Sequence, residues 1–176
     1  MTLGKFVVAL GILLWLPAHA LAQAPKFPAK PIRMVVGYAP GGGSDIMGRL
    51  IAQQIADALG QKVIVENRPG VSQNVAAEYV AKSPNDGYTL FLSSAALSIN
   101  VSLYSNLNYD PVKDFAPVAV IATSPNLLLV HPSLPAKNIR EFIAVAKINP
   151  GKLNFSSPGN GSTQHLSGEL LKLQTG

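Results

Sequence analysis

The chain has 176 residues, with 14 Lys and Arg against 9 Asp and Glu and a formal net charge of +5. It contains no cysteine, which excludes disulfides, thiolate metal sites and a cysteine nucleophile. The basic residues are scattered singly along the chain, a distribution that predicts a solvated surface and no nucleic-acid binding.

The N-terminus predicts an export signal. Lys5 precedes an apolar run at residues 6–16, and Ala20-Leu21-Ala22 follows with small residues at the spacing typical of a signal-peptidase site. The apolar run is too short to span the ~30 Å hydrocarbon core of a bilayer. We therefore expect residues 1–22 to be a cleavable signal peptide and the mature chain to begin at Gln23. Because no cysteine is available to carry a lipid anchor, the expected location is the periplasm.

The next part of the chain alternates strand and helix signals. Strand-like and helical runs follow one another at residues 32–36, 44–59, 62–66, 75–82 and 86–94. In the first helical run Ser44 is the expected cap and Gly60 the expected stop. A strand-then-helix order favours parallel pairing with right-handed crossovers. The predicted fold class is therefore α/β, with a parallel-rich sheet and flanking helices.

After Ser94 the pattern loosens. Residues 97–115 are rich in Asn and Ser and predict a short helix and a loop. The next residues predict two strands, at 116–124 and 126–132, and a helix at 138–151 that stops at Gly151. A further strand at 153–157 and a glycine-rich turn into a last helix at 158–176 complete the pattern.

Two glycine-rich loops, each with a hydroxyl residue, therefore lead from a predicted strand into a predicted helix: VVGYAPGGGSDIM and LNFSSPGNGSTQHL. The first N–H groups of a helix lack intrahelical partners, and the helix dipole places partial positive charge there. Glycine allows a ligand to approach the backbone and allows positive φ. Either loop can thus hold an anion, with a tight capped turn as the alternative. For Asp45 the alternative to ligand contact is a cap that pairs with Arg49.

A nucleotide is the rival ligand of the first loop. The phosphate-loop pattern fails because no Lys follows Gly48. The dinucleotide pattern begins in Gly41–Gly43 but has Ile46 in place of its third glycine, while Glu66 ends the second strand where a ribose-binding carboxylate belongs. A Rossmann-like nucleotide-binding enzyme that uses Gly41–Gly43 is therefore the alternative reading. The chain has no G-x-S-x-G motif, and its scattered histidines predict no metal site.

Several long stretches of the chain resemble the Bug family, the solute receptors of tripartite tricarboxylate transporters. They are residues 31–70, 74–94, 109–122, 128–137 and 149–170. The resemblance implies a type II periplasmic binding protein, in which two α/β domains are joined by hinge strands and a small carboxylate lies in the cleft. It implies no catalysis and no cofactor. It also implies delivery of the ligand to the membrane permease subunits of the transporter, and a monomeric full-length form.

The resemblance also implies the ligand-binding residues. Backbone N–H groups of one loop from each domain hold the carboxylate, and neighbouring residues line the cleft. In this sequence the positions are Tyr38, Ala39, Gly41, Gly42, Gly43, Ser44, Asp45, Gln73, Ser94, Ser157, Gly159, Asn160, Gly161, Ser162 and Thr163. Val71-Ser72-Gln73 stands where the family has a small, glycine-rich stretch, so Gln73 is expected to reach the cleft and alter its volume.

Domain boundaries follow from the same resemblance. Residues 23–124 are expected to form domain 1, and residues 125–176 the hinge strands and part of domain 2. Chains of the family continue well beyond this length. The expectation is therefore a truncated receptor that does not function by itself.

Overall fold

The computed structural model describes residues 26–176, so the expected signal peptide and its cleavage before Gln23 lie outside the described residues. Its centre is a three-stranded parallel sheet in the order β2-β1-β3, formed by β1 (Ile32–Val36), β2 (Val63–Asn67) and β3 (Thr89–Leu92). The predicted α/β class with parallel strands is confirmed.

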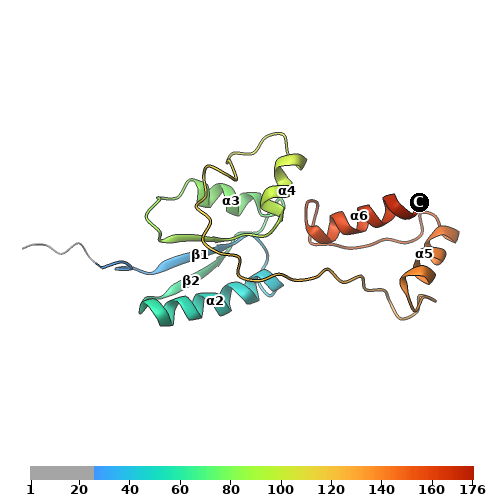
Figure 1. Cartoon of the computed structure of the whole chain (residues 1–176), viewed down its shortest axis with the longest axis horizontal. Coiled ribbons are helices and arrows are strands. Elements are labelled where there is room, and N and C mark those ends of the chain that lie inside the picture. Colours follow the sequence, from blue (N-terminus) through green and yellow to red (C-terminus); the bar gives the residue numbers. More distant parts are fainter. Residues whose placement is uncertain (1–25) are drawn as a thin grey trace, which may run out of the picture.

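β1 forms the core of the sheet because helices cover both of its faces. Helix α2 (Gly43–Leu59) lies along one face, and α3 (Asn74–Ala81) lies on the other (Figure 1). Consequently Met34, Val35 and Val36 are all almost inaccessible to solvent. A continuous apolar run is what a parallel strand buried on both faces requires.

Helix α2 starts earlier than its sequence predicts. Gly42, with φ −77° and ψ 166°, occupies the N-cap position without any side-chain cap, and Ser44 lies inside the first turn. The prediction of Ser44 as the cap was therefore wrong. The helix ends as predicted at Gly60, which takes the left-handed conformation with φ +66°.

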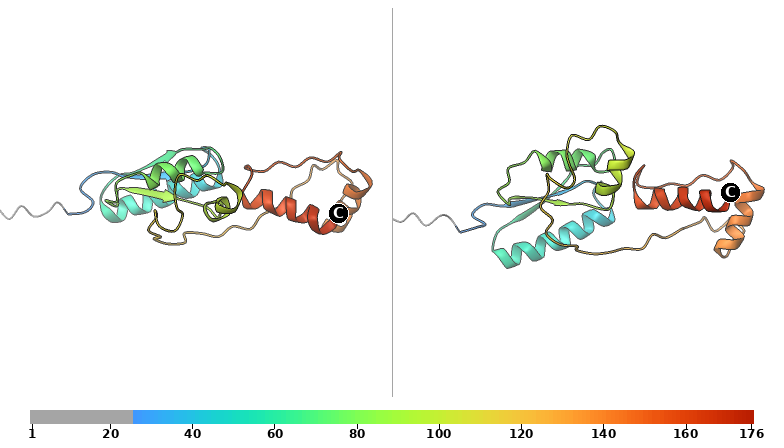
Figure 2. Two further views of the ribbon diagram at one scale, coloured as in Figure 1. Left: turned by 90° about the horizontal axis from the view of Figure 1, so that it is seen from above. Right: turned by 45° about the horizontal axis from the view of Figure 1, so that its top comes forward.

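Three further helices follow the predicted order. Helix α4 (Ala96–Leu103) comes after β3, and α5 (Ile139–Ile148) and α6 (Thr163–Thr175) form the C-terminal part. An extended segment leads away from the sheet to α5, and the chain returns so that the start of α6 lies near α4 (Figures 1 and 2). None of the helices in residues 26–176 combines the length and apolarity needed to cross a bilayer.

Three predicted strands are absent. Residues 116–124, 126–132 and 153–157 lie in no strand, although the first two are rich in β-branched and aliphatic side chains. The exposed fractions of Val118 and Leu129 are 88% and 83%. The reason is physical: β propensity reflects packing on a sheet surface, and within residues 26–176 these segments have no neighbouring strand to pair with.

Candidate functional site

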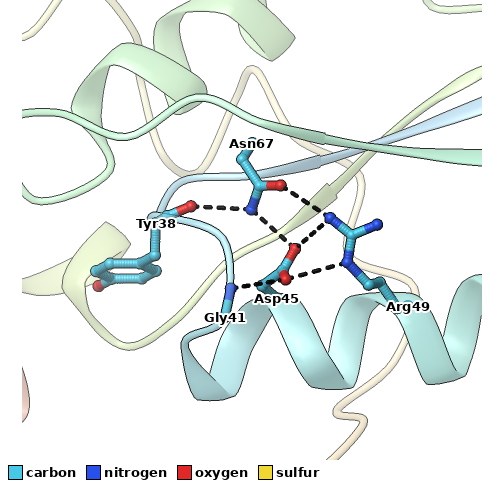
Figure 3. A network of polar contacts seen from close by, with 5 residues as sticks. All are labelled: Tyr38, Gly41, Asp45, Arg49 and Asn67. Carbon is cyan, nitrogen blue, oxygen red and sulfur yellow. Dashed lines mark hydrogen bonds and ion pairs between the residues drawn. The ribbon is translucent and has the colours of Figure 1, made fainter.

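The first glycine-rich loop is organised by the carboxylate of Asp45 (Figure 3). Oδ2 accepts hydrogen bonds from the Gly41 N–H at 2.9 Å and from Arg49 Nε at 3.0 Å. Oδ1 accepts from Asn67 Nδ2 at 3.0 Å, and Asn67 also donates to the Tyr38 carbonyl at 3.0 Å. Asp45 is only 4% exposed. This carboxylate therefore joins the loop, the first turn of α2 and the end of β2.

The same contacts fix the charge of Asp45. The hydrogen bond from Arg49, followed by those from the Gly41 N–H and Asn67, lowers the pKa of Asp45 from 3.8 to about 2, although desolvation opposes the shift. In return, Asp45 raises the pKa of Arg49. Both groups are thus ionised around neutral pH. Arg49 offsets the negative charge that would otherwise repel an anion from this helix terminus.

The start of α2 presents free backbone donors. The N–H groups of Gly43, Ser44 and Asp45 meet no acceptor among residues 26–176. Of the three consecutive glycines only Gly41 takes a positive φ, at +82°, so the left-handed conformation explains one glycine and not the run. A Cβ at Gly41 or Gly43 would meet nothing within 4 Å. The absence of side chains leaves the helix terminus open to a ligand.

A second group of predicted residues forms a wall beside this loop. The Tyr38 hydroxyl lies 2.9 Å from Ser94 Oγ. Gln73 lies behind Ser94: its Nε2 donates to the Ser94 carbonyl at 3.3 Å, and its Oε1 accepts from the Ser94 N–H at 3.2 Å. Gln73 is fully buried, so it acts on the site by holding Ser94 and not through an exposed amide. Ala39 precedes the loop, and its carbonyl lies 3.5 Å from the Gly42 nitrogen.

The second glycine-rich loop has a conventional cap. Ser162 is the N-cap of α6, and its Oγ accepts from the His165 N–H at 3.2 Å. The Ser157 hydroxyl accepts from the Gly159 N–H at 3.3 Å and lies 3.4 Å from His165 Nδ1. Four backbone N–H groups of this loop and the first turn of α6 have no acceptor within residues 26–176, those of Asn160, Gly161, Thr163 and Gln164. The second loop therefore offers the same kind of donor set as the first.

Both loops lie at the carboxyl edge of the parallel sheet. The first follows β1 directly. The second reaches the same edge because Gly161 packs against Ser72 and Asn100, which lie beyond the ends of β2 and β3. Crevices at the carboxyl ends of parallel strands are the usual ligand sites of α/β proteins. Two surface cavities, of about 340 and 200 Å³, are lined by other residues and involve neither glycine loop.

Two organising residues, Asn67 and Asn100, were missed by the sequence analysis. Asn67 is the polar last residue of β2, which is a weak signal, whereas Asn100 lies inside helix α4 and carries no signal in the sequence. Conversely, Glu66 does not suit the nucleotide alternative. Its carboxylate pairs with Arg33 at 3.2 Å and with Arg68 at 2.6 Å, so arginine contacts already occupy the group that a ribose would need.

Comparison with known proteins gives a consistent result. The sequence model described as "Tripartite tricarboxylate transporter family receptor" matches residues 47–176. Curated relatives match along most of this chain, which spans about half of their length.

Solved structures resemble this chain over the same half. The R. palustris protein Rpa4515 with adipate is 41% identical with a TM-score of 0.82, over 85% of this chain and 50% of that chain. MatC from Rhodopseudomonas palustris with bound malate is 35% identical with a TM-score of 0.74, over 84% and 50%. The periplasmic binding protein BugD is 31% identical with a TM-score of 0.74, over 85% and 50%.

Proposed function

Since this chain belongs to the family of tripartite tricarboxylate transporter receptors, we propose that it captures a small carboxylate in the periplasm for such a transporter. One observation carries the proposal. Two glycine-rich helix termini, those of α2 and α6, each present several unbonded backbone N–H groups near one edge of the sheet. Such termini attract anions without a charged side chain.

The proposed ligand is a dicarboxylate or a related small acid. One carboxylate is held by the N–H groups of Gly43 and Ser44, and the other by the unbonded N–H groups of the second loop and the first turn of α6, those of Asn160, Gly161, Thr163 and Gln164. Tyr38 and Ser94 line the space beside the first loop, where their hydroxyl groups supply further hydrogen bonds. The adipate and malate in two similar structures support this class of ligand.

The mechanism proposed is binding followed by delivery, without catalysis. One loop comes from domain 1, residues 23–124, and the other from the second part, residues 125–176. Asp45 orders the first loop, because internal donors already occupy both of its oxygens. Release of the ligand to the permease subunits of the transporter is the role that the family description supports. The resemblance to a periplasmic binding protein supports the periplasmic location.

The test is a Gly42→Val variant. At φ −77° and ψ 166° valine fits the backbone, and its Cβ would meet only the Ala39 carbonyl oxygen at 3.5 Å, so the fold should persist. We expect its side chain to hinder the approach of a ligand to the N–H groups of the helix terminus. Loss of about two charge-assisted hydrogen bonds, at ~1.5–3 kcal/mol each, predicts more than a hundredfold weaker binding.

Isothermal titration calorimetry with adipate and with malate measures this effect. Gln54→Val, which adds the same side chain on the exposed surface of α2, is the matched control and should bind like the parent. Equal affinities of the Gly42→Val variant and the parent would show that the first loop is only a turn. This chain is expected not to bind by itself, so the titrations use the chain extended to the full length of its relatives. Failure of that parent to bind any small carboxylate would overturn the proposed function.

A further inference from the structure

A single small contact seats the second glycine-rich loop on the sheet domain. Within residues 117–176, all of which are described, only Gly161 and Ser162 are buried. No hydrogen bond or ion pair between described residues joins the segment 131–176 to residues 26–115. The position of this loop relative to the sheet therefore depends on how Gly161 fits.

The surface that receives Gly161 is shaped for a residue without a side chain. A Cβ at Gly161 would lie 2.8 Å from Asn100 Oδ1, 3.0 Å from Leu103 Cδ1 and 3.3 Å from Ser72 Oγ, and Gly161 has φ +85°. We call this contact the Gly161 notch. Both steric fit and backbone conformation favour glycine here.

The notch cannot easily widen. Asn100 is fully buried, and its Nδ2 donates to the Ser72 carbonyl at 2.8 Å and to Asn74 Oδ1 at 2.6 Å. The Tyr109 hydroxyl donates to the same Asn74 oxygen at 2.6 Å. This network holds Asn100 in place from two sides, so its Oδ1 stays aimed at Gly161.

Seating the loop also leaves two polar atoms unsatisfied. Ser72 Oγ and Asn100 Oδ1 are both buried without a hydrogen-bond partner. Both atoms lie against Gly161, so we expect water to reach them when the loop moves away. Burial of a polar atom without a partner is unfavourable, so the notch fits the loop sterically while opposing its docking energetically.

We propose that Ser72, Asn100 and Gly161 are positioning residues that fix the spacing between the two glycine-rich loops. They also keep the docked state, in which Gly161 lies against the sheet domain, only weakly favoured. A ligand that bridges both loops then supplies the free energy that holds them together. This last step rests on the proposed function, whereas the docking equilibrium itself does not. The notch also predicts which dicarboxylates bind, because loop spacing limits the distance between the two carboxylates.

Distance measurements by double electron–electron resonance test the docking equilibrium without ligand. The absence of cysteine allows spin labels at Gln54→Cys on α2 and Gln174→Cys on α6, both of which are exposed. In this doubly labelled protein we expect Gly161→Ala to increase the mean distance between the two labels and to broaden its distribution. Gly159→Ala is the matched control, because Gly159 lies in the same loop with φ +128° but its Cβ would meet nothing within 4 Å.

A Ser72→Ala variant tests the same idea in the opposite direction. It removes one unpartnered hydroxyl and leaves the Ser72 carbonyl that Asn100 contacts. We expect the ratio of docked to undocked molecules to rise about tenfold. The proposed role of the Gly161 notch would be wrong if Gly161→Ala and Gly159→Ala gave identical distance distributions. It would also be wrong if Ser72→Ala lowered the ratio of docked to undocked molecules.

Titration with dicarboxylates of increasing length separates this inference from the proposed function. Ser72→Ala should strengthen binding of the preferred dicarboxylate, while Gly161→Ala should weaken it and shift the preferred length. The expected distances, together with no binding of any dicarboxylate by the form extended to the relatives' full length, would support the notch and refute the proposed function. Binding with a length preference that neither variant changes would refute the positioning role alone.

Discussion

Replacement of Gly37 by alanine is the sharpest test of how the sheet and α3 are packed. Gly37 directly follows β1, and a Cβ at this position would lie 2.3 Å from Gln73 Cβ and 3.0 Å from Gln73 Cα. The optimum separation of two carbon atoms is ~3.5–4.0 Å. Because Gln73 Cβ is fixed to the backbone at the start of α3, no rotamer change relieves the overlap. The helix must therefore move away from β1.

The expected loss of stability follows from this overlap. Overpacking of a well-packed core costs ~1–3 kcal/mol, and the short distance between two backbone-anchored atoms places Gly37→Ala near ~3 kcal/mol. A folded domain has only ~5–15 kcal/mol of stability in total. Gln73 is fully buried and hydrogen-bonded to the backbone of Ser94, so a displaced Gln73 would also free Ser94 beside the first loop.

Urea unfolding followed by circular dichroism measures the change. Gly43→Ala is the control, because its Cβ would meet nothing within 4 Å and helix propensity predicts an effect of less than ~1 kcal/mol. In a Gln73→Gly background, Gly37→Ala should be milder by ~1–3 kcal/mol. An unfolding midpoint for Gly37→Ala equal to that of Gly43→Ala, or no coupling to Gln73, would refute the packing argument.

Two further predictions concern charge and backbone strain. The pKa of Asp45 is lowered from 3.8 to about 2 in the folded state, so its contribution to the free energy of unfolding is complete above pH 3.8 and is lost as pH falls toward 2. Over this range the parent should lose stability more steeply than Asp45→Asn. Equal losses of stability in the two proteins would contradict this. Val71 has φ +45° and is 56% exposed, so Val71→Gly should relieve strain of ~1–2 kcal/mol against a glycine penalty of ~0.5–1 kcal/mol. A net gain of ~1 kcal/mol in thermal or urea unfolding is expected, and an unchanged or lower midpoint would contradict the strain.

Local signals were enough to predict most of the sheet domain. The strand at Ile32–Val36 has the predicted bounds because a buried parallel strand is rich in apolar residues, and here only the exposed Arg33 interrupts them. The stop of α2 at Gly60 was predictable because only glycine takes the left-handed conformation easily. Ser44 was mistaken for the cap because its residue type suits that position, whereas Gly42 is the N-cap and Asp45, in the first turn, accepts the hydrogen bond from the Gly41 N–H.

Features that depend on distant parts of the chain were not predictable. Residues 116–132 have strand composition, but a strand also requires a partner, and composition does not reveal whether one is present. The contacts of Gln73 with Ser94 and of Asn100 with Gly161 each join different loops at the sheet edge. Their pairing depends on crossover geometry and side-chain direction. Both loops are therefore recognisable in the sequence, but the residues that hold them are not.

The two glycine-rich loops offer the same donors but are held in different ways. A buried, ionised carboxylate with three side-chain and backbone donors fixes the first loop, so its N–H groups are oriented before any ligand arrives. The second loop relies on its Ser162 cap and on the Gly161 notch, which leaves two polar atoms without partners. Preorganised donors favour affinity, because no ordering is required on binding. A loosely docked partner favours discrimination, because only a ligand that reaches both loops offsets the unfavourable docking. In the proposed receptor, affinity therefore arises mainly at Asp45 and its loop, and the choice among acids at Gly161.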